Sequence, residues 1–198
     1  DHYRNFNFSP LVRARLTHIN GTNIDELKTK AKEKDDTRKL SFLSRSYNLT
    51  YKDQLNKSEK IIDGAFWGEG YDGPGISLEV DFAKSMNMKM GDSIGFDLAG
   101  LPLDGKVTSL RTIDWSSMMP NFFVILPTKK LEAAPQFIIG SARIDEKQIS
   151  IFQNQLVAQF PNISVLELST IFKKVQNLFE KVLKVLVVSS GLCIMASL

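Results

Sequence analysis

Residues 8–21 read FSPLVRARLTHING, and they open the chain as a strand followed by a turn. Across residues 12–17 apolar and polar side chains alternate, which is the period of a strand with one buried face. The closing Asn20-Gly21 pair is a turn signal. Thr22 or Asn23 can then cap a charged helix with acidic residues in its first turn. With a second extended segment at 46–51, the first third is predicted to be a strand–helix–strand unit.

The middle third begins with a change of composition at residues 63–75, which are rich in glycine and aromatic side chains. Ser77 can cap a helix over residues 77–90 that ends at Gly91, although the first half of this segment also alternates as a strand would. Three further β signals follow: an alternating strand at 94–98, a hairpin turn at Asp104-Gly105 and a buried apolar strand at 121–126. We therefore expect a compact β-rich unit with one helix.

The last third returns to the pattern of the first, with a strand at 136–143, a helix at 145–160 and a strand at 163–168. The order of elements predicts an α+β fold in which two strand–helix–strand units surround a β-rich insert. The predicted units are a discontinuous subdomain formed by residues 1–62 and 136–168, and an insert formed by residues 63–135.

Residues 169–198 form the end of the chain and have the pattern of a single helix. Their apolar stripe at three-and-four spacing holds Ile171, Val175, Leu178 and Val182. After Lys184 no charged residue follows. A transmembrane helix needs about 20 apolar residues, so the uncharged tail is long enough for only part of one span. We expect a helix that continues into the first part of a membrane span.

Composition excludes several classes of function. The net charge is +3, and lysine alternates with acidic residues across 25–39, whereas a nucleic-acid protein would concentrate its basic residues on one face. The single cysteine, Cys193, lies in the apolar tail, and the two histidines are His2 and His18. No zinc site of recognisable spacing can be formed from these residues. We therefore expect no metal, no cofactor and no nucleic acid.

Two motif matches fail on their context. Residues 91–95 fit the G-x-S-x-G elbow of a Ser93 hydrolase, but that motif requires a strand before the serine, a helix after it and a histidine later in the chain. Residues 100–106 have the G-x-x-x-x-G-K skeleton of a phosphate loop, but Val107 stands where a metal-binding hydroxyl is needed. With no catalytic constellation, we expect a binding or mechanical domain; a Ser93 hydrolase is the remote alternative.

One segment has the composition of a contact loop. It carries large aromatic and thioether side chains, which adapt well to a hydrophobic partner: Trp115, Met118, Met119 and Phe122. The alternative is that these side chains pack onto the sheet as ordinary core.

A series of landmarks in the order of the chain resembles a known family. They are PLVRARLTHING at 10–21, SRSYNLTY at 44–51, ISLE at 76–79, MGDSI at 90–94, GKVTSLR at 105–111, DW at 114–115, MPNFF at 119–123 and FPNISV at 160–165. The sequence resembles the YbbP-type permeases of the FtsX-like group of ABC transporter subunits, whose relatives include MacB and LolC. The resemblance covers nearly the whole chain.

That resemblance implies an extracytoplasmic domain between two membrane spans of a permease in a bacterial inner membrane, facing the periplasm. It implies a Porter-like part at 1–62 and 136–168, a Sabre-like insert at 63–135 and a stalk helix at 169–198. A cytoplasmic ATPase subunit would drive movement through the stalk toward a hydrophobic or lipid-like substrate. It further suggests a periplasmic lysophospholipase-like partner, and it allows a homodimer or pseudo-dimer. A scaffold that recruits such a partner is the alternative function. The resemblance supplies no catalytic residue.

Overall fold

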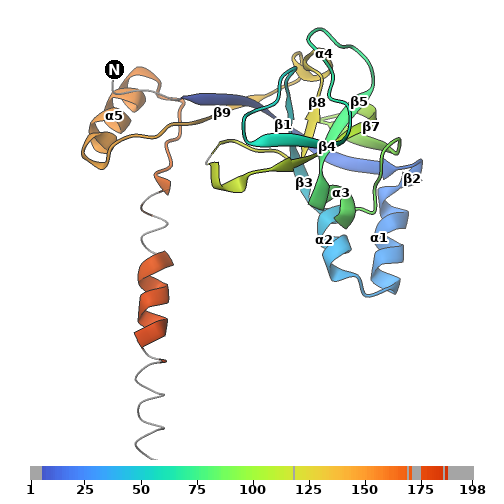
Figure 1. Cartoon of the computed structure of the whole chain (residues 1–198), viewed down its shortest axis with the longest axis horizontal. Helices are drawn as coiled ribbons and strands as arrows, with labels where there is room; N and C mark the ends of the chain where they lie inside the picture. The colour runs from blue at the N-terminus through green and yellow to red at the C-terminus, as the bar shows by residue number, and fades with distance from the viewer. Residues whose placement is uncertain (1–5, 118, 169, 171–174, 185, 187–198) are drawn as a thin grey trace, which may run out of the picture. The chain divides into compact units, whose positions relative to one another are not determined.

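The computed structural model describes residues 6–117, 119–168, 170, 175–184 and 186. The chain forms two compact units, Asp1–Arg143 and Ile144–Leu198 (Figure 1). The first unit contains every strand among the described residues, and the second is helical where it has regular structure. Each unit is described by itself below.

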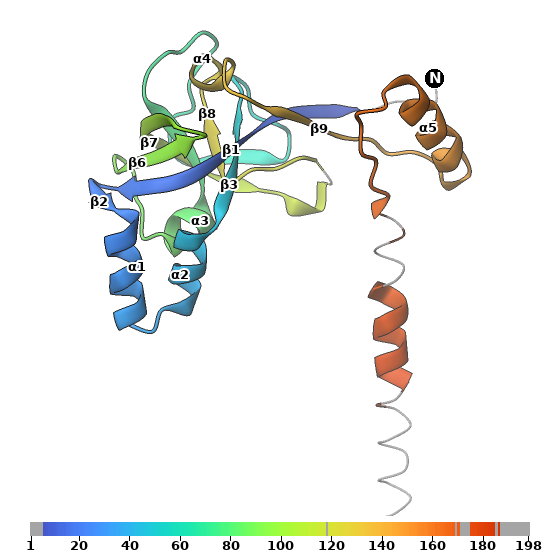
Figure 2. The same cartoon turned by 180° about the vertical axis from the view of Figure 1, so that it is seen from behind.

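Six strands of the first unit close into a ring. In the order of the ring they are β1 (Asn7–Ile19), β3 (Ser46–Tyr51), β8 (Val124–Leu126), β5 (Gly75–Glu79), β7 (Leu101–Ile113) and β6 (Ser93–Leu98). The β3–β8 and β5–β7 pairs are parallel and the other four pairs are antiparallel. Figures 1 and 2 show these strands from opposite sides. β1 and β7 extend beyond the ring.

Those extensions carry the remaining strands. The N-terminal part of β1 pairs with β9 (Phe137–Ser141), and the C-terminal part of β7 pairs with β4 (Glu59–Gly64). At its other end, β1 turns through Asn20 and Gly21 into the short β2 (Thr22–Asn23). Both turn residues have positive φ, 48° and 73°, as a two-residue hairpin turn of the primed type requires. The predicted strand and turn at the start of the chain are confirmed.

The helices of the first unit are short and lie outside the ring. They are α1 (Ile24–Glu33), α2 (Thr37–Ser44), α3 (Val80–Ser85), the 3₁₀ turn η1 (Trp115–Ser117) and α4 (Thr128–Leu131). The side chain of Asn23 accepts a hydrogen bond from the backbone N–H of Asp25, which confirms the predicted cap of α1. In both views α1 and α2 lie side by side (Figures 1 and 2).

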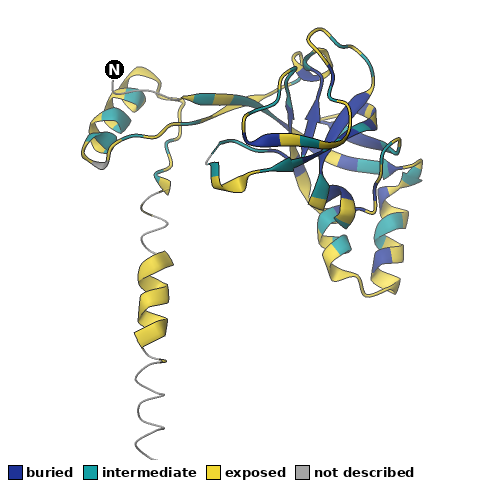
Figure 3. Ribbon diagram, viewed as in Figure 1, coloured by how far each residue is buried: buried dark blue, intermediate teal, exposed yellow. Residues whose placement is uncertain are grey.

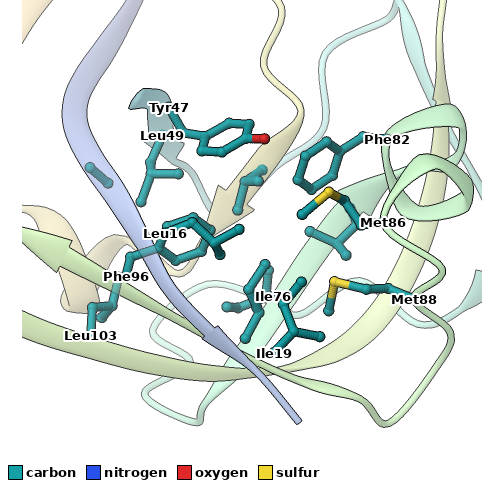
Figure 4. Packing of buried hydrophobic residues seen from close by; sticks show 14 of the residues in the cluster. Leu16, Ile19, Tyr47, Leu49, Ile76, Phe82, Met86, Met88, Phe96 and Leu103 are labelled. Carbon is teal, nitrogen blue, oxygen red and sulfur yellow. The ribbon is translucent and has the colours of Figure 1, made fainter. Parts of the chain in front are cut away.

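The hydrophobic core fills the ring. Leu49, Ile76, Leu78 and Ile94 are fully buried, and Met86 and Met88 pack beside them from the segment after α3 (Figure 4). Phe82 of α3 meets Tyr47 of β3 edge to face, with ring centroids 5.4 Å apart. Figure 3 shows buried residues concentrated on the strands, while α1 keeps an exposed outer face.

The helix predicted over residues 77–90 is only partly confirmed. Its first residues belong to β5, the strand that was the alternative for this segment, and α3 covers only Val80–Ser85, capped by the carboxylate of Glu79 instead of Ser77. Every residue of β5 is buried, because β5 lies between β7 and β8 in the closed ring. Gly91 belongs to the turn that precedes β6, where its φ is +85°.

The predicted hairpin turn at Asp104-Gly105 is also misplaced. The turn between β6 and β7 is formed by Ala99 and Gly100, both with positive φ, and Asp104 and Gly105 lie inside β7. A Cβ at Gly105 would lie 2.3 Å from Cδ1 of Ile76. This glycine therefore allows β7 to approach β5 closely and makes no turn.

The second unit contains α5 (Glu146–Gln159), which confirms the predicted helix at 145–160. The strand predicted at 163–168 is wrong: residues 163–167 have no regular structure, and residue 168 is helical. Leu166 is 71% exposed, and no neighbouring strand of the described residues pairs with this segment. Residues 175–184 are helical, and most of the remaining predicted stalk lies outside the described residues. Within the described ranges, every helix is too short or too polar to cross a bilayer.

The fold is α+β, as predicted, and its strands form one large sheet. Strands from both predicted subdomains contribute to it: β1 and β3 come from residues 1–62, and β5 to β8 come from 63–135. The Porter-like and Sabre-like division remains a prediction.

Candidate interaction site

A buried cluster of charged residues fixes the segment from Asp114 to Phe123. The side chains of Arg111 and Glu59 are completely buried, and Nε of Arg111 lies 3.4 Å from Oε1 of Glu59. Nζ of Lys52 lies 2.5 Å from Oε2 of the same carboxylate. Burial lowers the pKa of Lys52 and lowers the pKa of Arg111 to about 10, while Glu59 opposes both shifts. The carboxylate of Glu59 is therefore paired with both Lys52 and Arg111.

Arg111 uses its remaining donors on backbone carbonyls. Nη1 donates to the carbonyl of Ser77 at 2.7 Å and to that of Phe123 at 3.4 Å, and Nη2 donates to the carbonyl of Phe122. The backbone N–H of Glu79 also donates to the Phe123 carbonyl, at 2.8 Å. At the other end of the segment, the Asp114 N–H donates to the Ser58 carbonyl at 2.7 Å. The segment is held from inside the protein at both ends.

These bonds open a groove between β3 and the segment that precedes β8. The Phe122 and Phe123 carbonyls turn toward Arg111 and β5, so β8 pairs with β3 only from Val124 onward. Residues 46–48 of β3 therefore face residues 120–123 without a ladder between them. The opening measures about 250 Å³, and both Leu11 of β1 and Ile139 of β9 contribute to its lining.

Arg45 lines this groove, and its guanidinium packs against aromatic rings. Its guanidinium carbon lies 4.2 Å from the ring centroid of Phe42, 5.2 Å from that of Tyr47 and 5.4 Å from that of Phe123. A cation over the face of an aromatic ring is attracted by the ring's quadrupole. The Tyr47 hydroxyl donates to the Phe42 carbonyl at 2.5 Å; burial raises the pKa of Tyr47, and Arg45 opposes that shift. Arg45 is thus a positioned cation at an aromatic surface.

The residues of the predicted contact loop divide between surface and interior. Trp115 is 55% exposed, and its ring centroid lies 5.7 Å from that of Phe123. Phe122 is 6% exposed and lines the groove, and Met119 is half-buried. Met118 lies outside the described residues. The role of this loop in binding remains a prediction.

An apolar ribbon extends this surface. Pairing of β1 with β9 places Phe8 opposite Gly140 and Leu11 opposite Phe137. Phe8 is 68% exposed and Phe137 66% exposed. A Cβ at Gly140 would lie 2.9 Å from the Phe8 ring, so the glycine lets that ring lie across β9. Leu11, Phe137 and Ile139 occupy one face of the ribbon, and two of them line the groove.

The predicted stalk residues that can be described are exposed. Val175 is 42%, Leu178 61% and Val182 56% exposed, and all three lie in the helical stretch 175–184 (Figure 3). Ile171 lies outside the described residues. A row of exposed apolar side chains on one helix indicates a contact surface, although its use in coupling remains a prediction.

The serine motif lacks the context of a nucleophile elbow. Ser93 follows a turn and begins the strand β6. The nucleophile elbow requires instead a strand before the serine and a helix after it. His18 lies beside Gly95, with Nε2 3.1 Å from Oδ1 of Asp104 and Nδ1 3.1 Å from Oγ1 of Thr17. Among the described residues, no group of three His, Cys, Asp or Glu side chains could hold a metal ion.

Sequence reasoning missed the two arginines that define the site. Arg111 stands in an alternating strand where its side chain points to the same side as Val107 and Ser109, an interior position that could have been read as a buried cation. Arg45 follows Phe42 and precedes Tyr47, which is a local signal of aromatic and basic residues. The pairing of Arg111 with Glu59 carries no local signal.

Comparison with known proteins makes this chain a homologue of an ABC transporter permease. The relative is an uncharacterised permease, YbbP of Escherichia coli (strain K12), which is 35% identical over 168 residues, or 85% of this chain. The chain spans 19% of the length of that relative. The resemblance to YbbP-type permeases is thus confirmed. No family model matches the sequence.

One solved structure is similar at low level. It is a crystal structure of a domain from a Porphyromonas gingivalis protein described as a permease. The TM-score is 0.38 at 9% identity, and the match covers 79% of this chain and 70% of that chain. This TM-score is too low to establish a common fold.

Proposed function

We propose that this chain is the periplasmic domain of an ABC transporter permease subunit of a bacterial inner membrane. In this role it transmits movement from a cytoplasmic ATPase subunit to a hydrophobic or lipid-like substrate, or to a periplasmic partner. ATP hydrolysis takes place on the separate subunit, and this chain contributes no catalytic group. The observation that carries the proposal is the 35% identity to YbbP over 85% of the chain.

The structure supports this role through its exposed apolar surfaces. The helical stretch 175–184 presents Val175, Leu178 and Val182 to solvent, as a stalk awaiting another helix would. At the same time, the ring of strands encloses a core of buried hydrophobic side chains, so the first unit is suited to move as one body.

A scaffold role is the second candidate, favoured by the groove beside Trp115. A domain that recruits a periplasmic protein, such as a lysophospholipase-like esterase, would need an exposed aromatic anchor of this type. Both roles can coexist on one chain, because the groove and the stalk residues belong to different units.

The stalk is tested by Leu178→Asp in the complete transporter. A charge in the middle of an apolar helix contact is disfavoured, so we expect ATP hydrolysis to continue while transport or partner release is lost. Gln176→Asp introduces the same charge on the opposite side of the helix and should leave coupling intact. ATPase activity and transport are measured together in proteoliposomes. A fully active Leu178→Asp transporter would show that the stalk role is wrong.

A further inference from the structure

The groove between β3 and the segment at 120–123 has the composition of a binding site for an acidic, apolar peptide. Among the described residues that line it, Arg45 is the one charged side chain, and the walls are largely aromatic and aliphatic. Polar groups from Ser46, Asn48 and Asn121 complete the lining. A single cation on an apolar floor is complementary to an acidic group attached to apolar neighbours.

The positive charge around the groove is not neutralised within the described part of the chain. Arg13 is exposed and lies directly opposite Asn48 in the β1–β3 ladder, so it borders the groove. None of the ion pairs among the described residues includes Arg13 or Arg45. The neighbouring Arg15, which also takes part in none of these ion pairs, lies opposite Asp97 in the β1–β6 ladder.

The dimensions of the groove favour a peptide over an enclosed small molecule. Pockets that enclose small molecules usually measure about 300–1,000 Å³, and this groove, of about 250 Å³, is open on one side. Its apolar lining continues onto the ribbon face of Leu11, Phe137 and Ile139. The surface is therefore elongated: the groove has space for one or two side chains of a peptide, and the ribbon face can contact the residues that follow them.

The groove is also preorganised. The Arg111 cluster holds the carbonyls of Phe122 and Phe123 from the inside, and three aromatic rings hold the Arg45 guanidinium on the outside. A surface that is rigid before binding loses little entropy when a partner arrives. Tyrosine, tryptophan and arginine are the residue types most enriched among those that dominate binding energy at protein interfaces.

We propose that this groove binds a segment of a partner protein in which an acidic side chain adjoins apolar side chains. The carboxylate would pair with Arg45, with Arg13 adding longer-range attraction, and the apolar side chains would enter the groove beside Phe122. This deepens the scaffold role proposed above and rests on it for the identity of the partner, although binding itself is a property of the isolated chain.

The test is selection of short random peptides displayed on phage, using the purified chain as bait and the Arg45→Gln variant for counter-selection. We expect enrichment of peptides with Asp or Glu beside large apolar residues. A synthetic copy of an enriched peptide should bind about tenfold more weakly to Arg45→Gln, equivalent to about 1.4 kcal/mol, and a copy with Gln for Glu should lose a similar factor on the wild-type chain. Fluorescence anisotropy measures both.

Controls separate this proposal from folding effects and from the proposed function. Arg38→Gln removes an exposed arginine that is not part of the groove lining and should bind normally. Circular dichroism melts establish that Arg45→Gln is folded. Since no transporter is present, failure of peptide binding leaves the stalk experiment unaffected, and failure of coupling leaves the peptide result unaffected.

Three results would overturn the proposal. One is absence of any enriched peptide, and another is enrichment of peptides that lack acidic residues or bind Arg45→Gln equally well. The third is Arg45-dependent binding to vesicles of phosphatidylglycerol, compared with phosphatidylcholine, without peptide binding. That result would assign the groove to an anionic lipid surface.

Discussion

Arg111 and Arg45 contact the same short segment, at Phe122 and Phe123, but Arg111 is buried and Arg45 is exposed. Arg111 is completely buried, pairs with Glu59 and donates to the backbone carbonyls of Phe122 and Phe123. Arg45 is exposed, lies against the Phe123 ring and has no carboxylate partner among the described residues. The first arginine has its interactions satisfied inside the protein, whereas the second keeps its charge available.

This difference separates structural charge from charge available for recognition. A buried cation must be paired and hydrogen-bonded, because desolvation without compensation is very costly. Replacing a buried cation should therefore lower the free energy of unfolding of the whole domain. An exposed cation held by aromatic rings loses little hydration, so replacing it should mainly reduce the affinity for a partner. Replacement of Arg111 should therefore change stability more than binding, and replacement of Arg45 should change binding more than stability.

The largest effect is expected from Glu59→Ala. It leaves Arg111 and Lys52 without the carboxylate that balances them, and breaking a buried charge pair in this way costs about 3–5 kcal/mol. Urea denaturation measures the change in the free energy of unfolding. Glu69→Ala removes an exposed carboxylate of the same type and should change it by less than about 0.5 kcal/mol. Equal effects of the two variants would show that the Arg111 cluster is not a structural centre.

A much smaller effect on stability is expected from Arg45→Gln. The variant removes cation–π contacts at an exposed position, which are worth about 0.5–1 kcal/mol. The same urea experiment should show a small loss, and the unchanged slope of the transition should report an unchanged fold. If Arg45→Gln destabilised the chain as strongly as Glu59→Ala, the contrast between the two arginines would fail, and Arg45 would be a structural residue.

The sequence predicted those parts of the fold that depend on local pattern. The alternation of apolar and polar side chains predicts β1 and β6 near their observed positions, and β3 and β9 are also predicted near theirs. The apolar residues of β5 fit both a helix and a strand, so the sequence leaves both open, and the structure has the strand. A closed ring of strands is a long-range property, and alternation in one strand does not specify it.

The candidate site was predicted only in part, for a related reason. Aromatic and thioether composition pointed to the segment around Trp115, which does border the groove. Arg111 and Glu59 are 52 positions apart in the sequence, and their contact exists only because β4 pairs with β7. Likewise, Gly105 follows an aspartate as a turn glycine would, but its role is set by Ile76 on another strand.

The smallest effect is expected at Asp114, where the segment begins. Its carboxylate accepts hydrogen bonds from the backbone N–H of Ser116 at 3.0 Å and from the Ser116 hydroxyl at 2.6 Å, which lowers the pKa of Asp114 below its usual 3.8. Because the folded state favours the ionised form, this group stabilises the fold above pH 3.8, and its contribution is lost as the pH falls through the lowered pKa.

Asp114→Asn keeps the shape of the side chain and removes that titration. The difference in urea midpoint between wild type and Asp114→Asn should be largest at neutral pH and should disappear once the carboxylate is protonated. Because Asp114 is fully exposed, the difference will be small. A difference that stays constant over the whole pH range would mean that the charge of the Asp114 carboxylate does not stabilise the 3₁₀ turn η1.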